Sequence, residues 1–358
     1  MTEFRDLVAL SFLPPWQWRE IGGALRAGEP PSDVLVDAVA RVRHDPPTPA
    51  ELRARADDAI DRAARGPLRP LAWTEPAYPA ALAAIVDPPW LLWLRGSPDA
   101  LDRPAVAIVG SRAGSPYALA VAERLAEDLA ARGVAVVSGL ARGVDSAAHR
   151  GALASPGGVT IGVLGSGADV IYPPEHDGLV GEIEASGGAI LSELAPGTPP
   201  LPWCFPLRNR IISGLSRAVV VIEAGERSGS LITARTALEQ GRDVLAVPGN
   251  VLSGRNRGAH ALLRDGAKIV ESADDIWEEL GLPGPAARAA GTEIGSGTVQ
   301  GGEGTDPVLA CLPPGETCDL DLICERSGLS AARLLPRLFE LELDGRVRRA
   351  GGGRFVRV

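Results

Sequence analysis

Four short segments of this sequence combine glycine, serine and arginine in a way that suits phosphate binding. Glycine lets backbone N–H groups approach a ligand closely, serine donates a hydrogen bond without bulk, and arginine offers a two-pronged donor for phosphate oxygens. One such segment is weak evidence, because tight strand-to-helix turns use glycine for steric reasons alone. Four segments, three of them with arginine, predict a phosphate pocket; they are Gly110-Ser111-Arg112, residues 138–145, Gly165-Ser166-Gly167 and residues 223–230.

A fifth segment adds polar residues to the first turn of an expected helix, directly after Phe205-Pro206. These polar residues are Arg208, Asn209 and Arg210. They belong to residues 200–265, where nine arginines stand against five acids, a net charge of +4. Arginine beside aromatic residues suits single-stranded nucleic acid, because bases stack on rings while phosphates pair with guanidinium groups. Trp203 and Phe205 are the aromatic candidates, with core packing favoured for Phe205; a solvated helix face is the alternative for the arginines.

Several kinds of catalytic or cofactor site lack the residues that they require. A dinucleotide site needs Gly-x-Gly-x-x-Gly after the first strand, which the turn at 110–114 does not provide. A Walker A loop needs a lysine, and Lys268, the single lysine, is not in that setting. The four cysteines have no zinc spacing, and no serine has an evident histidine and acid partner. We therefore expect no cofactor, no metal and no catalytic residue.

Composition narrows the class of protein further. The chain has 358 residues, enough for two or three domains, and no apolar run reaches the roughly 18–20 residues of a membrane span. The N-terminal residues lack a signal-peptide pattern, so we expect a cytoplasmic protein with no membrane contact. The net charge of −9 argues against a whole-surface attraction to nucleic acid. The charge is segregated, however, with basic stretches at 200–265 and 320–358 and an acidic stretch at 281–319.

Residues 67–280 alternate short apolar runs with helical segments. Consecutive rather than alternating apolar residues indicate strands that are buried on both faces, as in a parallel sheet. The expected strands are 106–109, 134–137, 160–164, 189–191, 218–222, 244–247 and 268–270. The expected helices are 116–132, 145–153, 176–186, 207–215, 229–240 and 256–265. This alternation predicts an α/β fold with a doubly wound Rossmann-like parallel sheet, whose ligands bind beyond the carboxyl ends of the strands. The glycine-rich turns stand at those ends.

Three further regions complete the expected layout. Residues 1–66 form a helical N-terminal module, residues 281–306 a Gly-, Ala- and Pro-rich flexible linker, and residues 307–358 a small C-terminal module. In the last of these, helices at 319–327 and 330–343 precede two strands around a glycine turn. Helix, helix and β-hairpin in this order predict a winged helix-turn-helix module.

Over residues 75–280 the sequence resembles the DNA-processing protein A (DprA/Smf) family. The resemblance depends on several blocks that occur in the family's order. They are Val109-Gly110-Ser111-Arg112, residues 138–145 with Ala148-His149, residues 164–167 with Tyr172-Pro173, Leu191-Ser192-Glu193, residues 205–212, residues 228–234 and Val247-Pro248-Gly249. The layout of a helical (SAM-like) N-terminal module, a Rossmann-like domain and a winged helix also resembles the family.

The resemblance implies a protein that is not an enzyme. It implies binding of incoming single-stranded DNA during natural transformation, protection of that DNA, and help in loading a RecA-type recombinase. It also implies a homodimer formed through the Rossmann-like domain. The implied DNA-binding residues, together with those predicted from the turns, are Gly110, Ser111, Arg112, Gly139, Arg142, Gly143, Arg208, Asn209, Arg210, Ser228, Gly229, Ser230 and Thr233.

The sequence departs from the family pattern in three places and leaves two alternatives open. Residues 201–204 lack the basic residue that often precedes Phe-Pro, Ala118 stands where glycine is common, and His260 stands where asparagine is common. The first alternative is a Rossmann-like nucleotide or phosphoribosyl hydrolase, in which Gly229, Thr233 and Glu239 would form the active set. The second is a transcription regulator that reads duplex DNA with its winged helix. The roles of Glu193 and His149 stay open.

Overall fold

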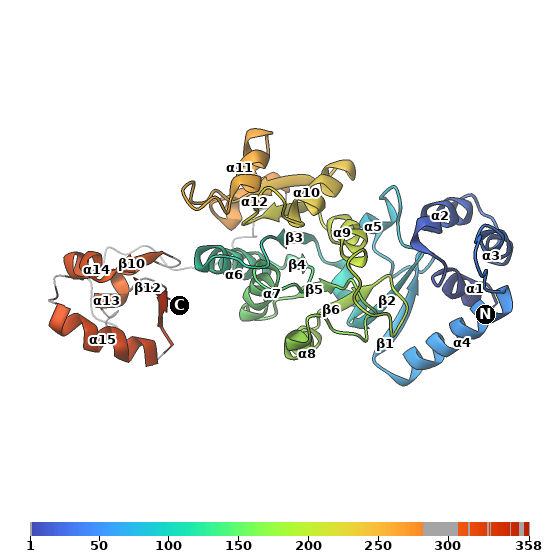
Figure 1. The fold of residues 1–358 in the computed structure, drawn as a ribbon, viewed down its shortest axis with the longest axis horizontal. Helices are drawn as coiled ribbons and strands as arrows, with labels where there is room; N and C mark the ends of the chain where they lie inside the picture. The colour runs from blue at the N-terminus through green and yellow to red at the C-terminus, as the bar shows by residue number, and fades with distance from the viewer. Residues whose placement is uncertain are drawn as a thin grey trace, which may run out of the picture. The chain divides into compact units, whose positions relative to one another are not determined.

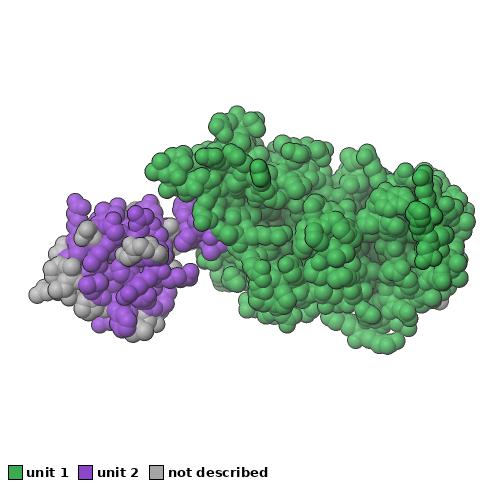
Figure 2. All heavy atoms as spheres, viewed as in Figure 1, with its two compact units in different colours: residues 1–113, 122–280 green, residues 114–121, 281–358 purple. Residues whose placement is uncertain are grey.

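The computed structural model describes residues 2–281, 307–313, 316–327, 329, 331–343, 345–350 and 354–357 (Figure 1). The chain divides into two compact units, one of residues 1–113 and 122–280 and the other of residues 114–121 and 281–358 (Figure 2). The predicted linker, residues 281–306, lies outside the described residues except for Gly281. The predicted boundary between residues 66 and 67 falls inside the first unit and stays a prediction.

A mixed sheet of nine strands forms the centre of the first unit, in the order β1-β2-β6-β5-β4-β3-β7-β8-β9. The seven strands from β6 to β9 in this order are parallel to one another, whereas β2 pairs antiparallel with both β6 and the edge strand β1. The strands are β1 (Leu68–Ala72), β2 (Leu91–Gly96), β3 (Ala105–Val109), β4 (Ala135–Ser138), β5 (Thr160–Val163), β6 (Ala189–Ser192), β7 (Ala218–Val221), β8 (Asp243–Ala246) and β9 (Lys268–Ile269).

The parallel part of the sheet confirms the predicted Rossmann-like fold. All seven predicted strands are present, and every residue of β3, β4, β5, β6 and β7 is buried. Burial on both faces explains why these strands read as uninterrupted apolar runs. The helices that alternate with them are α6 (Pro116–Ala131), α7 (Val144–Ala154), α8 (Asp177–Ala185), α9 (Cys204–Leu215), α10 (Ser230–Glu239), α11 (Arg257–Arg264) and α12 (Ala273–Glu279).

The antiparallel edge of the sheet is the part that the sequence-based prediction missed. The prediction named only the strands of the parallel sheet, and β2, which pairs antiparallel with both β1 and β6, was not among them. Strand β1 contains Pro70, which lacks a backbone N–H and is tolerated because β1 is an edge strand. A strand with a central proline has the composition of a loop, and this concealed β1.

Four helices precede the sheet and share a core with its β1–β2 edge. They are α1 (Thr2–Leu10), α2 (Trp18–Arg26), α3 (Pro31–Ala40) and α4 (Pro49–Arg65). The rings of Trp18 and Trp90 meet edge to face at 5.7 Å, and the Trp90 indole donates a hydrogen bond to the Leu7 carbonyl at 3.1 Å. Helix α4 begins at a capping box in which Thr48 and Glu51 each accept a backbone hydrogen bond from the other.

The second unit contains the predicted winged helix. Its elements are α13 (Pro307–Ala310), β10 (Thr317–Asp319), α14 (Leu320–Ser327), α15 (Ala331–Leu343), β11 (Val347–Ala350) and β12 (Arg354–Arg357). The sequence predicted α14, α15 and the two strands of the hairpin but missed α13 and β10. Strand β10 completes a small three-stranded sheet of order β10-β12-β11. Leu334, Leu338 and Leu341 of α15 are buried in the core of this module, as their helical spacing indicates.

None of the helices in the described part of the chain combines the length and the apolar character that crossing a bilayer requires.

Candidate phosphate-binding site

The topology of the sheet creates a crevice where the strand order reverses. From β3 the chain moves outward through β4, β5 and β6, and it then returns to β7 on the other side of β3. The turns after β3 and β7 therefore diverge, and such a switch point is where open α/β sheets bind ligands.

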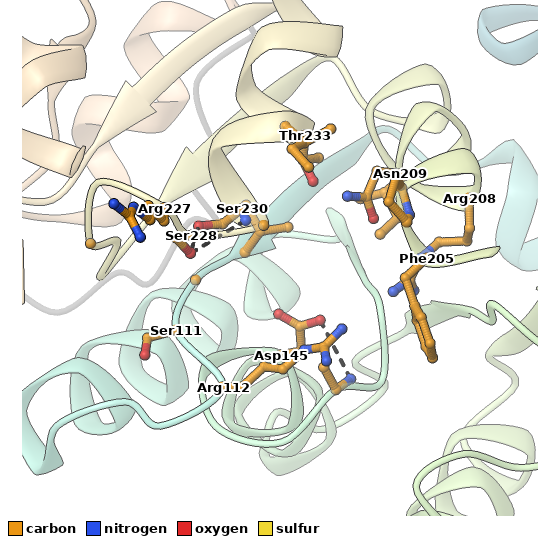
Figure 3. A pocket seen from close by; sticks show the side chains of 18 of the residues that line it. Ser111, Arg112, Asp145, Phe205, Arg208, Asn209, Arg227, Ser228, Ser230 and Thr233 are labelled. Carbon is orange, nitrogen blue, oxygen red and sulfur yellow. Dashed lines mark hydrogen bonds between the residues drawn. The ribbon is translucent and has the colours of Figure 1, made fainter. Parts of the chain in front are cut away.

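A pocket of about 860 Å³ occupies this crevice (Figure 3). The turns after β3 and β7, the turn before α7 and one face of α9 enclose it. In the close view, Arg227 and Ser228 lie on one side of the pocket, Arg112 and Asp145 at its base, and Asn209 and Phe205 on the opposite side (Figure 3). Its lining comprises Val109, Gly110, Ser111, Arg112, Ala113, Ala141, Asp145, Tyr172, Pro202, Phe205, Pro206, Arg208, Asn209, Ile212, Gly225, Arg227, Ser228, Gly229, Ser230, Ile232 and Thr233.

The turn after β3 is held by the turn that precedes α7. The Ser111 hydroxyl accepts a hydrogen bond from the Ala113 N–H at 3.2 Å, and the Ser111 carbonyl accepts one from the Val144 N–H at 3.2 Å. Gly143 has a φ of +79°, and a Cβ at this position would lie 2.3 Å from the Ser111 carbonyl oxygen. Gly143 does not line the pocket, so its contribution is to permit the close contact that shapes the Ser111–Arg112 turn.

Replacing Gly143 by alanine is expected to destabilise the protein more than the same replacement at Gly157. Both glycines have positive φ, but nothing lies within 4 Å of a Cβ added at Gly157. Gly157→Ala therefore incurs only the backbone strain of about 1–2 kcal/mol, while Gly143→Ala adds a collision with backbone, of about 1–3 kcal/mol. Urea unfolding of the two variants measures the difference. Equal losses of stability would show that the Ser111–Arg112 turn shifts to accommodate the added Cβ at no cost in free energy.

A buried carboxyl and a buried guanidinium lie beneath the pocket. Asp145 accepts hydrogen bonds from the N–H groups of Gly139 (3.2 Å) and Ala141 (3.4 Å), and the Arg208 guanidinium donates to the Val163 carbonyl. Burial raises the pKa of Asp145, and the same cause lowers the pKa of Arg208 to about 10, although each group partly offsets the shift of the other. Arg208 therefore stays charged at neutral pH.

Gly139 explains how this guanidinium fits under the turn after β4. A Cβ added at Gly139 would lie 2.4 Å from Arg208 Nη1. The absence of a side chain at Gly139 is therefore what admits Arg208, which reaches the turn from α9. The sequence-based assignment of both residues to one site agrees with this contact, although Gly139 itself does not line the pocket.

Aromatic rings form one wall of the pocket. The guanidinium carbon of Arg112 lies 5.2 Å from the centre of the Phe205 ring, and the Tyr172 ring packs against the same ring at 5.7 Å. The sequence favours core packing for Phe205, whereas the structure places it half-buried on the pocket wall. Arginine over an aromatic face is a cation–π arrangement, and it orients the Arg112 guanidinium group toward the pocket.

The turn after β7 brings hydroxyl groups to the N-terminus of α10. The Ser228 and Ser230 hydroxyl oxygens are 2.7 Å apart and share a hydrogen bond, and the Ser230 N–H donates to the Ser228 hydroxyl at 3.4 Å. Thr233 follows on the buried face of the helix and also lines the pocket. Unpaired backbone donors and the positive end of the helix dipole make such a terminus favourable for an anion.

Arg227 and Tyr172 are among the pocket-lining residues that were not predicted as site residues. Arg227 is exposed, lines the pocket, and its side chain has no hydrogen bond or ion pair within the described residues. Its position directly before Ser228, in a segment predicted to bind phosphate, was the signal that could have identified it. Tyr172 belongs to a block that supported the family resemblance, but no local pattern assigned it to the pocket, because its place beside Phe205 depends on how the loop after β5 folds.

Arg142 and Arg210, both predicted to bind, do not line the pocket. Arg142 is exposed and forms an ion pair with Glu175. Arg210 is buried; its guanidinium donates to the two Glu193 carboxylate oxygens at 2.8 and 2.6 Å and to Asp87 at 3.0 Å. Burial on its own lowers the pKa of Arg210, but Glu193 and Asp87 outweigh burial and raise it. The remaining predicted residues, Gly110, Ser111, Arg112, Arg208, Asn209, Ser228, Gly229, Ser230 and Thr233, do meet in the pocket.

Comparison with known proteins gives consistent matches. Residues 69–281 match the family model of the DNA recombination-mediator protein A, and residues 301–353 match that of the DprA winged helix domain. The chain is 41% identical over 286 residues to the protein Smf of Escherichia coli K12, covering 78% of this chain and 75% of Smf. It is 47% identical over 203 residues to the DNA processing protein DprA of Streptococcus pneumoniae R6, covering 57% of this chain and 71% of that protein.

Solved structures are similar as well. The crystal structure of DNA processing protein A from Streptococcus pneumoniae superposes with a TM-score of 0.64 at 36% identity, over 77% of this chain and 96% of that one. The DNA processing protein A of Helicobacter pylori, whose structure was described for its single-stranded DNA binding mode, gives a TM-score of 0.54 at 32% identity. That match covers 60% of this chain and 95% of the other.

Proposed function

The chain belongs to the DNA recombination-mediator protein A (DprA/Smf) family, and we propose on this basis that it binds incoming single-stranded DNA in natural transformation. In this role it protects the strand and helps to load a RecA-type recombinase. The observation that supports the proposal most directly is the pocket at the switch point of the sheet, where hydroxyl, backbone and arginine donors face an aromatic wall.

The chemistry of the pocket suits a single strand better than a duplex. Arg112, Arg227 and the Ser228–Ser230 turn present donors for phosphate oxygens on two sides of the pocket. Phe205 and Tyr172 offer ring faces on which an unpaired base can stack. In a duplex the bases are already stacked on one another and cannot reach such a wall. Single-stranded DNA is therefore the ligand that can contact both the phosphate donors and the aromatic wall of the pocket.

We assign different roles to the predicted site residues. Direct contact is proposed for Gly110, Ser111, Arg112, Asn209, Arg227, Ser228, Gly229, Ser230 and Thr233. Gly139 and Gly143 allow the close packing of the turns, Arg208 supplies positive charge from below, and Arg210 holds α9 in place. Arg142 lies outside the pocket, so it would contact only a part of the strand that extends beyond the pocket.

The proposed function does not involve catalysis. Asp145 is the single acid among the described lining residues, and it already accepts two backbone hydrogen bonds. In the alternative hydrolase, Glu239 would act together with Gly229 and Thr233. Glu239 ends α10 and is exposed, about 9 Å along the helix from Thr233 at 1.5 Å per residue. Glu193, whose role the sequence left open, is paired with Arg210. Binding without turnover fits this arrangement.

Partners and location rest on the family. We propose a homodimer formed through the Rossmann-like domain, a contact with a RecA-type recombinase, and a cytoplasmic location. No cofactor enters the proposal. Recombinase loading belongs to the same proposal, because a protein that holds single-stranded DNA by its phosphates could present that strand to a second strand-binding protein.

Fluorescence anisotropy of a labelled single-stranded oligonucleotide across a salt series tests the proposal, with a duplex of equal length alongside. We expect preference for the single strand and an affinity that falls steeply with salt, because arginine–phosphate contacts release counterions. Equal binding of the two forms would contradict the proposal and favour the winged helix as the DNA contact. Turnover of a nucleoside monophosphate would favour the hydrolase.

A further inference from the structure

Trp203 is an exposed aromatic residue that neither the pocket nor the core accounts for. All seven tryptophans of the chain lie within residues 2–281, and only Trp16 and Trp203 are exposed there, at 65% and 45% of their surface. Trp203 is not in the pocket lining, and its indole N–H has no partner among the described residues. Its neighbours in sequence, however, form the pocket wall.

The helical position of Trp203 places it at the rim of the pocket. Trp203 is the N-cap residue of α9 and has helical backbone angles, φ −73° and ψ −21°. Residues three or four apart share a helix face, so Trp203 lies on the face that continues through Pro206 and Leu207. Pro206 lines the large pocket, while Leu207 lines a second, smaller cavity on the other flank of α9. Trp203 therefore lies at the N-terminal end of α9, between the pocket and the smaller cavity.

The second cavity lies on the opposite flank of α9 from the pocket. It has a volume of about 80 Å³, too small for a nucleotide, and it lies between α9 and the N-terminal helices. Its lining includes Trp18, Arg19, Arg26 and Trp90. The Arg19 side chain is exposed and has no hydrogen bond or ion pair within the described residues. A free guanidinium thus follows Trp203 on the side away from the pocket.

We propose that Trp203 is a base-stacking platform for a nucleotide just outside the pocket, on the path of the strand toward Arg19. The inference rests on the proposed function and extends it with a binding residue. An indole that is nearly half exposed and unpaired offers a ring face to a base, and this interaction tolerates every base because each has a π face. Arg112 and Arg227 contact phosphates inside the pocket, and Trp203 holds the strand where it emerges.

Stacking differs from phosphate contact in its dependence on salt, which makes the inference testable. Trp203→Ala is expected to weaken binding of an oligothymidylate about tenfold at every salt concentration, because an uncharged contact releases no counterion. Trp203→Phe is expected to retain most of the affinity and Trp203→Leu to lose it, because leucine keeps apolar surface without a π face. Trp16→Ala, which removes the other exposed indole, is the matched control and is expected to bind as the parent does.

Tryptophan fluorescence supplies an independent measurement on the same variants. Binding of the oligothymidylate is expected to quench the emission of the parent protein and of Trp16→Phe, and Trp203→Phe is expected to lose most of that quenching. Undiminished quenching in Trp203→Phe, or parental affinity in Trp203→Ala, would overturn the inference. So would equal affinity of the leucine and phenylalanine variants, or dissociation of a dimer in Trp203→Ala, which would assign the indole to a second copy of the chain.

The inference and the proposed function fail in different ways. If the parent protein does not bind the oligothymidylate at all, both fail. If binding depends on Arg112 and Arg227 but is indifferent to Trp203, the function stands and the stacking role alone is refuted.

Discussion

Replacing Arg112 and Arg227 together by alanine is expected to weaken single-strand binding about 100-fold, and each single replacement about tenfold. Both side chains are exposed at the pocket, and neither has an ion pair within the described residues that would hold it away from a ligand. Each is expected to pair with one phosphate. Anisotropy titrations with a labelled single strand give the affinities directly.

The salt dependence of the same titrations tests the mechanism behind the loss. Each phosphate contact on a single strand contributes about 0.7 to the slope of log affinity against log salt, so the double variant is expected to lose about 1.4. An affinity loss without a change in slope would mean that the arginines shape the pocket instead of contacting phosphate.

Two control arginines separate a local effect from a change in total charge. Arg217 is exposed and directly precedes β7, at the end of the sheet opposite to the pocket. Arg217→Ala removes the same charge as Arg112→Ala and is expected to change the affinity less than twofold. Arg333→Ala, in the winged-helix module, is also expected to have a smaller effect than Arg112→Ala. A loss at either control as large as that at Arg112 would place the principal DNA contact outside the pocket.

Replacing Glu193 by alanine is expected to lower the free energy of unfolding by about 3–5 kcal/mol, the typical cost of leaving one partner of a buried ion pair uncompensated. Arg210 is buried, and Glu193 accepts two of its hydrogen bonds at 2.6 and 2.8 Å. Asp87 is much more exposed than Glu193 and accepts a hydrogen bond only from the Nε of Arg210. It therefore cannot replace the lost carboxylate of Glu193. Thermal or urea unfolding measures the change.

A second variant shows whether the ion pair or its side-chain volume is responsible. Removing both charges, in Glu193→Leu combined with Arg210→Met, is expected to destabilise far less than Glu193→Ala, because no unpaired charge stays buried. Glu182→Ala removes an exposed acid of α8 and is expected to change stability by no more than about 0.5 kcal/mol. A double variant as unstable as Glu193→Ala would assign the loss to packing.

Much of the fold could be predicted from local sequence. Strands β3 to β8 are apolar at nearly every position, because helices cover both faces of a parallel sheet and only Asp243, at the start of β8, is exposed. The turns that follow them are rich in glycine and serine, so both the sheet and the ligand-binding edge were predictable. The nine predicted residues that meet in the pocket lie in those turns, on α9 or in the first turn of α10.

The sequence could not show which arginine of α9 faces the ligand. Arg208 and Arg210 are two residues apart, so a helix turns them roughly 200° from one another, and only one can point at the pocket. Arg208 lies under the turn at Gly139, and Arg210 points to Glu193 and Asp87. Asp87 is 123 residues away in the chain, and its approach depends on the β1–β2 edge that the sequence-based prediction missed.

The sequence alone therefore determined the residue types of the candidate site, the family and the edge of the sheet where the pocket lies, because these depend on composition and on local periodicity. Tertiary structure alone decided the direction of each side chain. It turned Phe205 to the pocket, left Arg227 without a hydrogen bond or ion pair among the described residues, and buried Arg210 against Glu193 and Asp87. The physical reason is that charge pairing and burial are set by segments distant in sequence, and no local pattern records which of them come together.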